Sequence, residues 1–129
     1  MKRFLFLTAV MICGLSALTA QSKSAKIEFA ETLYNFGNIP EEGGDVSHEF
    51  VFTNTGNAPL VIYDVNTNCG CTDAEVPQAP IAAGGKGKIT IVFHPVGNPG
   101  EFAKEIVVKS NASNKKIKLR IKGVVFPKQ

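Results

Sequence analysis

Two cysteines separated by one glycine are the residues of this chain whose types and spacing could do chemistry. Residues 66–72 read NTNCGCT, which places Cys69 and Cys71 two positions apart. Such a pair can form a disulfide, hold a soft metal ion through two thiolates, or exchange with other thiols. The third cysteine of the chain, Cys13, lies near the N-terminus. The function therefore depends on which of these chemistries the surrounding sequence supports.

A disulfide between Cys69 and Cys71 would stabilise the fold only weakly. Residues two apart on an extended strand point the same way with Cα atoms roughly 7 Å apart, at the outer limit for bridging. Gly70 can adopt a positive φ, which would bend the chain and bring the sulfurs together. Because the closed loop is so short, chain entropy would contribute only about 1.6 kcal/mol before strain is subtracted. Strain would also make the bond easier to reduce than an ordinary structural disulfide.

A thiol-redox enzyme and a metal site are the sharper alternatives for the same pair. Redox enzymes usually carry C-x-x-C at the start of a helix, whose N-terminus favours the thiolate. Here no helical pattern follows Cys71, and Asp73 and Glu75 would disfavour a thiolate. A Cu(I) or zinc site would need ligands beyond two thiolates. The plainest interpretation is two small buried side chains at a strand crossing, oxidised or reduced.

The two histidines of the chain, His48 and His94, are the remaining candidates for metal ligation or proton transfer. His48 shares the parity of apolar residues on its strand, so a half-buried, hydrogen-bonded histidine is expected. A site formed by Cys69, Cys71 and His48 is the alternative. His94 precedes a proline and is expected in a loop. The motifs G-x-S-x-G, H-E-x-x-H and the P-loop are absent from the sequence, so no catalytic residue and no cofactor are predicted.

The N-terminus has the layout of a secretory signal peptide. A basic start precedes an apolar stretch over residues 4–15, and small residues lead up to Gln21. The apolar part is too short to span a bilayer. The residue before Cys13 is isoleucine, which argues against a lipoprotein signal. We therefore expect residues 1–20 to be a signal peptide and residues 21–129 to be one exported domain, periplasmic or secreted, without a membrane span.

Loss of the signal peptide would also change the charge of the protein. The chain has 14 basic and 11 acidic residues. Without Lys2 and Arg3 the balance is 12 against 11, which removes the compositional support for nucleic-acid binding. The charge that remains is uneven, because residues 21–85 carry two bases and nine acids, whereas residues 86–129 carry ten bases and two acids. Solvated charge explains most such patterns, and a basic face for an acidic partner is the alternative.

Short alternating runs separated by turn residues indicate an all-β domain. The last run has the clearest alternation, with Ile117, Leu119 and Ile121 expected to point inward. Seven strands are expected, the first of them broken, over residues 26–36, 46–53, 60–65, 72–76, 88–93, 102–109 and 116–122. That number of strands in roughly 105 residues predicts a seven-stranded immunoglobulin-like β-sandwich after the signal peptide.

Several motifs along the chain resemble a bacterial secreted family, domain-of-unknown-function family 1573. They are F-x-F-x-N-x-G at residues 50–56, PLVI at 59–62, CGCT at 69–72, IAAG at 81–84 and SN at 110–111. The resemblance spans about residues 27–125. The family is related to the ASH (ASPM, SPD-2, Hydin) and major-sperm-protein type of immunoglobulin-like domain. This resemblance implies a seven-stranded sandwich with scaffolding or binding work, and it implies no catalytic residues.

The sequence thus predicts an exported, non-enzymatic module that binds or scaffolds another protein of the envelope or the exterior. The candidate surface is the basic face of the last strand, formed by Lys116, Lys118, Arg120 and Lys122. Addition of a strand at a sheet edge is one candidate binding mode. The competing hypothesis is a thiol-redox or Cu(I)/zinc-handling protein that uses Cys69 and Cys71.

Overall fold

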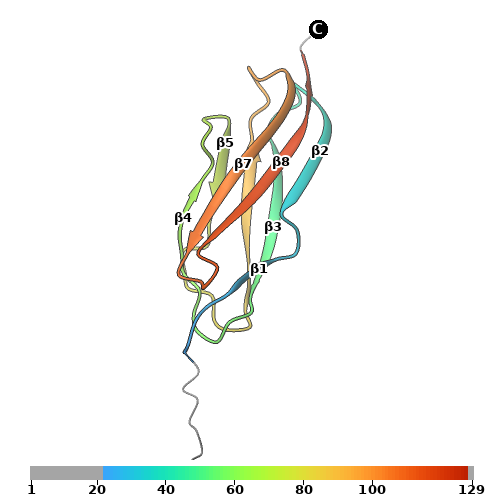
Figure 1. Ribbon diagram of the computed structural model, residues 1–129. Helices are drawn as coiled ribbons and strands as arrows, with labels where there is room; N and C mark the ends of the chain where they lie inside the picture. The colour runs from blue at the N-terminus through green and yellow to red at the C-terminus, as the bar shows by residue number, and fades with distance from the viewer. Residues whose placement is uncertain (1–21, 128–129) are drawn as a thin grey trace, which may run out of the picture.

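Two four-stranded β-sheets pack face to face in the computed structural model, which describes residues 22–127 (Figure 1). The eight strands are β1 (Ile27–Phe29), β2 (Leu33–Pro40), β3 (Val46–Asn54), β4 (Ile62–Asn66), β5 (Thr72–Glu75), β6 (Lys86–Phe93), β7 (Gly100–Ser110) and β8 (Lys116–Phe126). One sheet has the order β1-β3-β6-β5, and the other has the order β2-β8-β7-β4. The predicted all-β class is confirmed. The expected signal peptide, with Cys13, lies outside the described residues.

The eighth strand comes from the broken first strand of the sequence prediction. β1 pairs antiparallel with β3, whereas β2 pairs in parallel with β8 in the opposite sheet. The short break at residues 30–32 therefore carries the chain from one sheet to the other. The third expected strand also begins later than predicted, because Leu60 forms an isolated bridge with Ile81 before β4 starts at Ile62.

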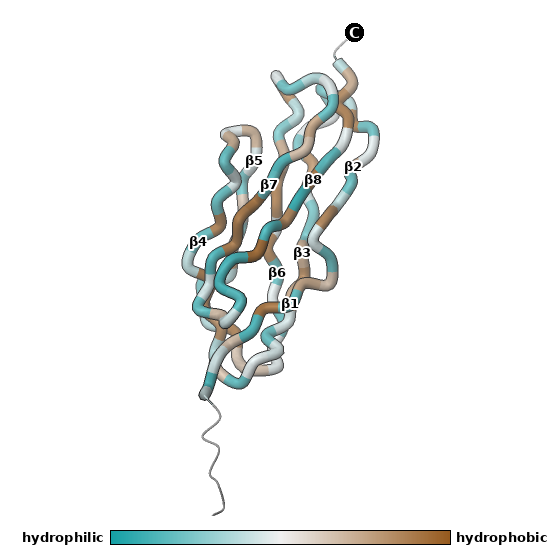
Figure 2. The backbone as a smooth tube through the Cα atoms, in the orientation of Figure 1, coloured by the Kyte–Doolittle hydropathy of each residue, from teal (hydrophilic) through white to brown (hydrophobic). Residues whose placement is uncertain are grey.

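The core lies between the two sheets and follows the predicted alternation. Fully buried side chains come from alternate positions of β3, β6 and β8, and Figure 2 shows apolar residues recurring along these long strands. Each such phenylalanine or isoleucine contributes on the order of 1.5–3 kcal/mol through burial. Phe93 of β6 and Phe102 of β7 stack with ring centroids 4.0 Å apart, which joins the sheets. Within the described chain no helix is long and apolar enough to cross a membrane.

The connecting loops gather at the two ends of the sandwich (Figure 1). The segment that enters from the N-terminus lies at one end, together with the loops at residues 55–61, 76–85 and 111–115. The opposite end, which we call the cysteine end, holds the loops at residues 41–45 and 94–99 and the turn that contains Cys69 and Cys71. The two ends are stabilised by different chemistry.

Candidate functional site

Asn54, the asparagine of the F-x-F-x-N-x-G motif, is fully buried, with 0% of its surface exposed. Its amide nitrogen donates to the carbonyl oxygens of Ala58 (2.8 Å) and Ile81 (3.0 Å). Its Oδ1 accepts from the backbone N–H groups of Lys26 (3.3 Å) and Gly56 (3.1 Å). One side chain thus joins the N-terminal segment, its own loop and the segment before β6. The motif therefore organises the fold at this end of the sandwich.

Two further asparagines, both in the loop between β7 and β8, act in the same way. Asn111 accepts from the Val61 N–H (2.8 Å) and donates to the Pro59 carbonyl (3.0 Å). Asn114 accepts from the Ile27 N–H (3.1 Å) and donates to the Ile27 carbonyl (2.7 Å). The second pair of bonds satisfies the outward backbone groups of Ile27, the first residue of β1. A partner strand could therefore not pair with Ile27 without displacing Asn114.

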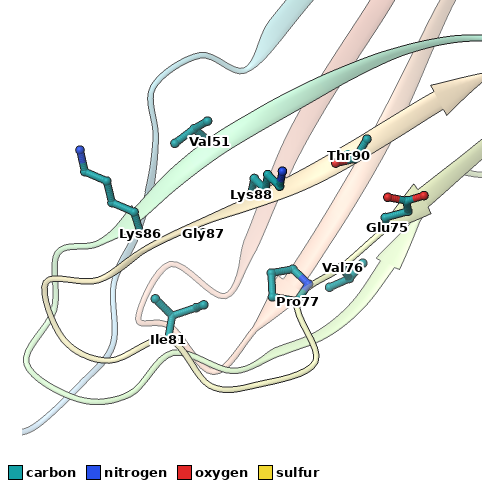
Figure 3. Close-up of a pocket in the computed structure, with 9 residues that line it drawn as sticks. All are labelled: Val51, Glu75, Val76, Pro77, Ile81, Lys86, Gly87, Lys88 and Thr90. Atoms are coloured by element: carbon teal, nitrogen blue, oxygen red, sulfur yellow. The ribbon is translucent and has the colours of Figure 1, made fainter.

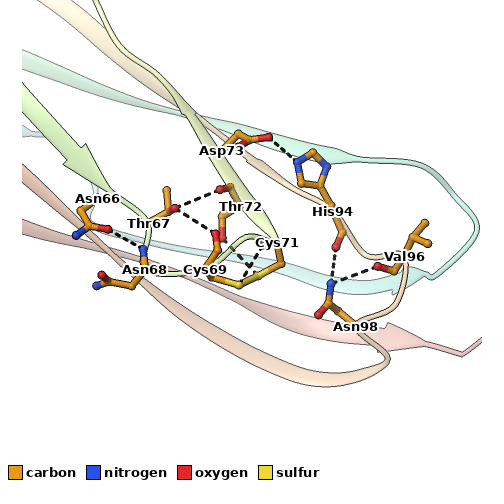
Figure 4. Close-up of a disulfide and its surroundings, with 10 residues drawn as sticks. All are labelled: Asn66, Thr67, Asn68, Cys69, Cys71, Thr72, Asp73, His94, Val96 and Asn98. Atoms are coloured by element: carbon orange, nitrogen blue, oxygen red, sulfur yellow. Dashed lines mark hydrogen bonds and ion pairs between the residues drawn. A yellow bond between two sulfur atoms is a disulfide. The ribbon is translucent and has the colours of Figure 1, made fainter.

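At the opposite end, Cys69 and Cys71 form a disulfide in the turn between β4 and β5 (Figure 4). Their Cα atoms are 5.2 Å apart, well within the range that a disulfide spans. Cys71 belongs to the core and is 7% exposed, whereas Cys69 is half-buried at its margin. The two cysteines therefore differ in their exposure to solvent.

The bend that brings the cysteines together is not made by Gly70, and the expectation of a positive φ there is wrong. The left-handed residue of the turn is Asn68, with a φ of 54°. Asparagine tolerates this conformation better than other side chains do. The Asn68 N–H is fixed by the Oδ1 atom of Asn66 at 2.9 Å. A Cβ atom on Gly70 would meet nothing within 4 Å, so neither backbone nor space requires glycine there.

The turn is also held by hydrogen bonds that do not involve the disulfide (Figure 4). The Thr67 hydroxyl lies within hydrogen-bond distance of the carbonyl oxygens of Cys69 (3.3 Å) and Thr72 (3.2 Å). The Thr72 N–H donates back to the Cys69 carbonyl (3.3 Å). The His94 N–H donates to the Cys71 carbonyl (2.8 Å) and continues the β5–β6 ladder.

His94 lies in a loop, as expected, but it bridges two acidic side chains. Its Nδ1 lies 2.8 Å from Asp45, and its Nε2 lies 2.7 Å from Asp73. A neutral imidazole has one N–H, so two carboxylate partners favour the cation. The hydrogen bonds to Asp45 and Asp73 raise the pKa of His94 above its ordinary value of 6.5 and outweigh partial desolvation. The His94 side chain is 32% exposed and links the β2–β3 loop to β5.

This bridge predicts a pH dependence of stability. Because the folded pKa of His94 is raised, its contribution is fully present below about pH 6.5 and is lost as pH rises through the folded pKa. We expect His94→Gln to remove this decline, which corresponds to the titration of one proton. Urea unfolding of both proteins at several pH values between 5.5 and about 9 measures the difference. Parallel pH profiles for the two proteins would contradict the bridge.

The structure does not bring Cys69, Cys71 and His48 together as a metal site. The His48 ring stacks on Tyr34 with centroids 3.6 Å apart, and its Nε2 contacts the Glu31 carboxylate. β6 separates its strand, β3, from β5. Across residues 22–127, no group of three or more His, Cys, Asp or Glu side chains could hold a metal ion. His48 therefore packs across the sheets as the plainer interpretation expected.

The four basic residues singled out in the sequence are all exposed on the outer face of β8, the strand between β2 and β7. They are Lys116, Lys118, Arg120 and Lys122, and we call them the β8 basic face. Glu105 of β7 contacts Arg120 (3.4 Å) and, more loosely, Lys118 (3.9 Å). Lys109 of β7 is exposed and is the register partner of Lys116. Positive charge is therefore most concentrated toward the β7–β8 hairpin.

The outer face of the other sheet carries an open groove of about 630 Å³ that sequence reasoning missed (Figure 3). Its apolar part is formed by Val51, Val76, Pro77 and Ile81, with Lys86, Lys88 and Glu75 around it. The available signal was Val51, an apolar residue on the otherwise polar face of β3, which is 41% exposed. The segment that follows β5 has no regular pattern of apolar residues, so its position over the sheet could not be predicted from the sequence.

Solved structures with the same fold are similar to most of this chain. A protein of unknown function from Porphyromonas gingivalis W83 has a TM-score of 0.71 and 21% identity over 86% of this chain and 51% of its own. This chain thus spans about half the length of that protein. The ASH/PapD-like domain 7 of human CEP192 has a TM-score of 0.65 and 14% identity, covering 82% and 89%. The E. coli chaperone DraB has a TM-score of 0.54 and 14% identity, covering 80% and 56%.

At these identities the solved structures show the fold alone, which is an ASH-like sandwich of the immunoglobulin type. None of the curated proteins matches the chain. The family model described as "Protein of unknown function (DUF1573)" matches residues 27–125, which include the buried asparagine, the C-G-C-T turn and β8 up to Val125. The match covers well over half of the sequence, and the chain therefore belongs to this DUF1573 family.

Proposed function

We propose that this domain is a non-enzymatic protein-binding module of the cell envelope or exterior, and that the β8 basic face binds an acidic segment of its partner. The observation that carries the proposal is the row of four exposed basic side chains on a central strand, opposed on the neighbouring strand by Glu105. Central strands present a flat, rigid surface, and an excess of positive charge on it steers a partner of opposite sign.

The organisation of the other polar groups supports a binding role over catalysis. The two cysteines are bonded to each other, His94 is held between two carboxylates, and His48 is stacked on an aromatic ring. Cysteine and histidine are among the residue types that supply nucleophiles or general bases, and each of these four is engaged in structure. A chaperone among the similar structures supports the use of this fold for binding other proteins. The N-terminal signal pattern supports export.

The sheet edges are poorly suited to binding by strand addition. This favours the outer face of β8 as the binding surface. On the β1 edge Asn114 occupies the backbone groups of Ile27, and β2 carries a bulge between Asn35 and Asn38 and ends at Pro40. The register of β4 shifts between Ile62 and Asp64, and β5 is four residues long. Bulges, prolines and short strands all disfavour addition of a further strand.

The test is a charge reversal with a matched control. We expect Lys116→Glu, Lys118→Glu and Lys122→Glu together to weaken partner capture at least about tenfold, because attraction becomes repulsion at the contact. Capture is measured by crosslinking the tagged full-length chain in its own organism and quantifying the recovered proteins. Raising the salt during capture by the unaltered protein should weaken it in the same direction.

The matched control reverses three exposed lysines that lie away from β8, namely Lys23, Lys26 and Lys86. It makes the same change in net charge and is expected to leave capture unchanged. Equal loss in the two triple variants would show that only net charge matters and would contradict the proposed face. Unfolding curves of both variants distinguish lost binding from lost folding.

A further inference from the structure

We propose that the Cys69–Cys71 disulfide is a site of thiol exchange, at which an external dithiol attacks Cys69 and Cys71 is the leaving group. This activity is independent of the β8 basic face. It rests on the unequal exposure of the two cysteines, on a hydrogen-bond donor at each sulfur, and on a turn that is held together by other contacts.

The direction of attack follows from burial. Cys71 is 7% exposed and packs within the core cluster, whereas Cys69 lies half-buried at the margin of that cluster. Thiol–disulfide exchange requires direct approach of the attacking sulfur, so the more accessible sulfur is the one attacked. The asymmetry leaves Cys69 to carry the mixed disulfide.

Both sulfurs have a donor that would stabilise negative charge. The Cys71 N–H donates to the Cys69 sulfur at 3.2 Å. The Thr72 hydroxyl lies 3.6 Å from the Cys71 sulfur, and it must be the donor because a disulfide sulfur carries no proton. Thr72 is itself buried, so this contact is shielded from water. Hydrogen bonds to a leaving thiolate are stronger than those to a neutral sulfur, and they favour its departure.

The acidic residues that argued against a thiolate in the sequence are offset or distant. The Asp73 carboxylate is engaged by the His94 ring at 2.7 Å, on the side of β5 that carries this contact (Figure 4). Glu75 projects to the groove on the outer face of the sheet (Figure 3). The electrostatic objection drawn from the sequence alone is therefore weakened by the fold.

Opening the bond should leave the domain folded. Thr67, Asn66 and the backbone ladder hold the turn without the disulfide. A loop closed over such a short separation also contributes little to stability through chain entropy. A disulfide that stabilises little can be opened and closed repeatedly in the native protein.

The exchange balances as a two-electron transfer. A thiolate of the external dithiol attacks the Cys69 sulfur, the bond between the two cysteines breaks, and its electron pair leaves on Cys71. The second thiol of the reagent then attacks the reagent's first sulfur, which is bonded to Cys69 in the mixed disulfide. Cys69 is released as a thiolate. The reagent ends as a disulfide, and its two protons pass to the two cysteines. The reverse sequence oxidises the protein.

The first test equilibrates protein isolated from its own envelope with mixtures of reduced and oxidised dithiothreitol at neutral pH. Alkylation and mass spectrometry of the peptide that contains residues 66–72 measure the reduced fraction, and circular dichroism follows the fold. We expect exchange without denaturant and an unchanged spectrum. Thr72→Val should slow reduction several-fold, and Thr72→Ser should restore the rate. Reduction only under unfolding conditions, or loss of the fold on reduction, would overturn the proposal.

The second test traps the natural reagent and identifies its class. In the full chain expressed in its own organism, the Cys69 thiolate of Cys71→Ser should attack the disulfide of the oxidised reagent and release one of its sulfurs as a thiolate. The resulting mixed disulfide should persist, because Cys71 is not there to displace the reagent, and dithiothreitol should reverse it. The matched variant Cys69→Ser leaves the buried sulfur and should carry at least about tenfold less adduct. A small mass increment identifies a low-molecular-weight thiol, and a large shift on a non-reducing gel identifies a protein thiol. No adduct on Cys71→Ser, or equal adducts on both variants, contradicts the direction of attack.

Discussion

Replacing Asn54 by aspartate is expected to destabilise the domain by about 4 kcal/mol, the largest effect that we predict for a single substitution. The carboxylate can still accept from Lys26 and Gly56, but it has no hydrogen to donate to the carbonyl oxygens of Ala58 and Ile81. Two buried acceptors lose their donor, and a charge is placed among them. For a domain of this size the melting temperature should fall by roughly 20 °C.

Asn38→Asp provides the matched control for this prediction. Asn38 is exposed on β2, so the same change in charge should alter stability by less than about 0.5 kcal/mol. Urea unfolding of the three proteins measures the differences. The loss in the Asn54 variant should shrink at low pH, because a protonated carboxyl regains one donor. If both variants were equally stable, Asn54 would not have the structural role assigned to it.

Gly56→Ala is expected to cost about 3 kcal/mol for a different reason, which is the lack of space. A Cβ atom there would lie 2.3 Å from the Ser24 carbonyl oxygen and 2.5 Å from the Lys26 nitrogen. Both are backbone atoms, and the segment is fixed by backbone bonds from Thr55 to Lys26 and from Asn57 to Ser24. To admit the methyl group, the segment must move and break these bonds.

Gly70→Ala is the control for the effect of glycine replacement. Gly70 has an ordinary φ and open space around it, so the substitution should change stability by less than about 0.5 kcal/mol. Hydrogen exchange of the amides around Lys26 should accelerate in the Gly56 variant alone. Two equally destabilised variants would mean that loss of glycine flexibility, and not the clash, sets the cost.

These predictions separate two kinds of residue within the motifs that define the family resemblance. Asn54 and Gly56 hold the N-terminal segment against the loops and are required for the fold. The C-G-C-T turn is held by several contacts at once, so it can tolerate change and opening. The motifs of this family resemblance thus supply structural anchors at one end of the sandwich and the proposed site of exchange at the other.

Period-two alternation was sufficient to predict the core of the sandwich. Leu119 and Ile121 on β8 are buried as expected, and Phe50 and Phe52 on β3 are buried by the same rule, because a regular strand must point alternate side chains to the same face. The same pattern predicted that the basic residues of β8 are exposed. Alternation does not show to which sheet a strand belongs. For this reason the crossing of the chain from one sheet to the other at residues 30–32 was not predicted.

The contacts around His94 could not be predicted because they join residues distant in sequence. Asp45, Asp73 and His94 lie on three different loops and strands, and only the β3–β6–β5 order brings them together. The conformation at Asn68 was missed for a local reason. Glycine is the usual left-handed residue, but the Asn66 side chain fixes the Asn68 N–H and shifts the bend by two positions.

Site-specific photocrosslinking in the organism that makes the protein tests the proposed binding surface most directly. Val107, beside Lys118 on the outer face of β7, can carry the photoreactive side chain without loss of a basic residue. Ser47, exposed on β3 in the opposite sheet, provides the matched position. We predict a single major crosslinked protein from position 107 that is absent from position 47 and disappears when Lys116, Lys118 and Lys122 are reversed. The same crosslinked product from both positions, or its persistence after reversal, would contradict binding through the β8 basic face.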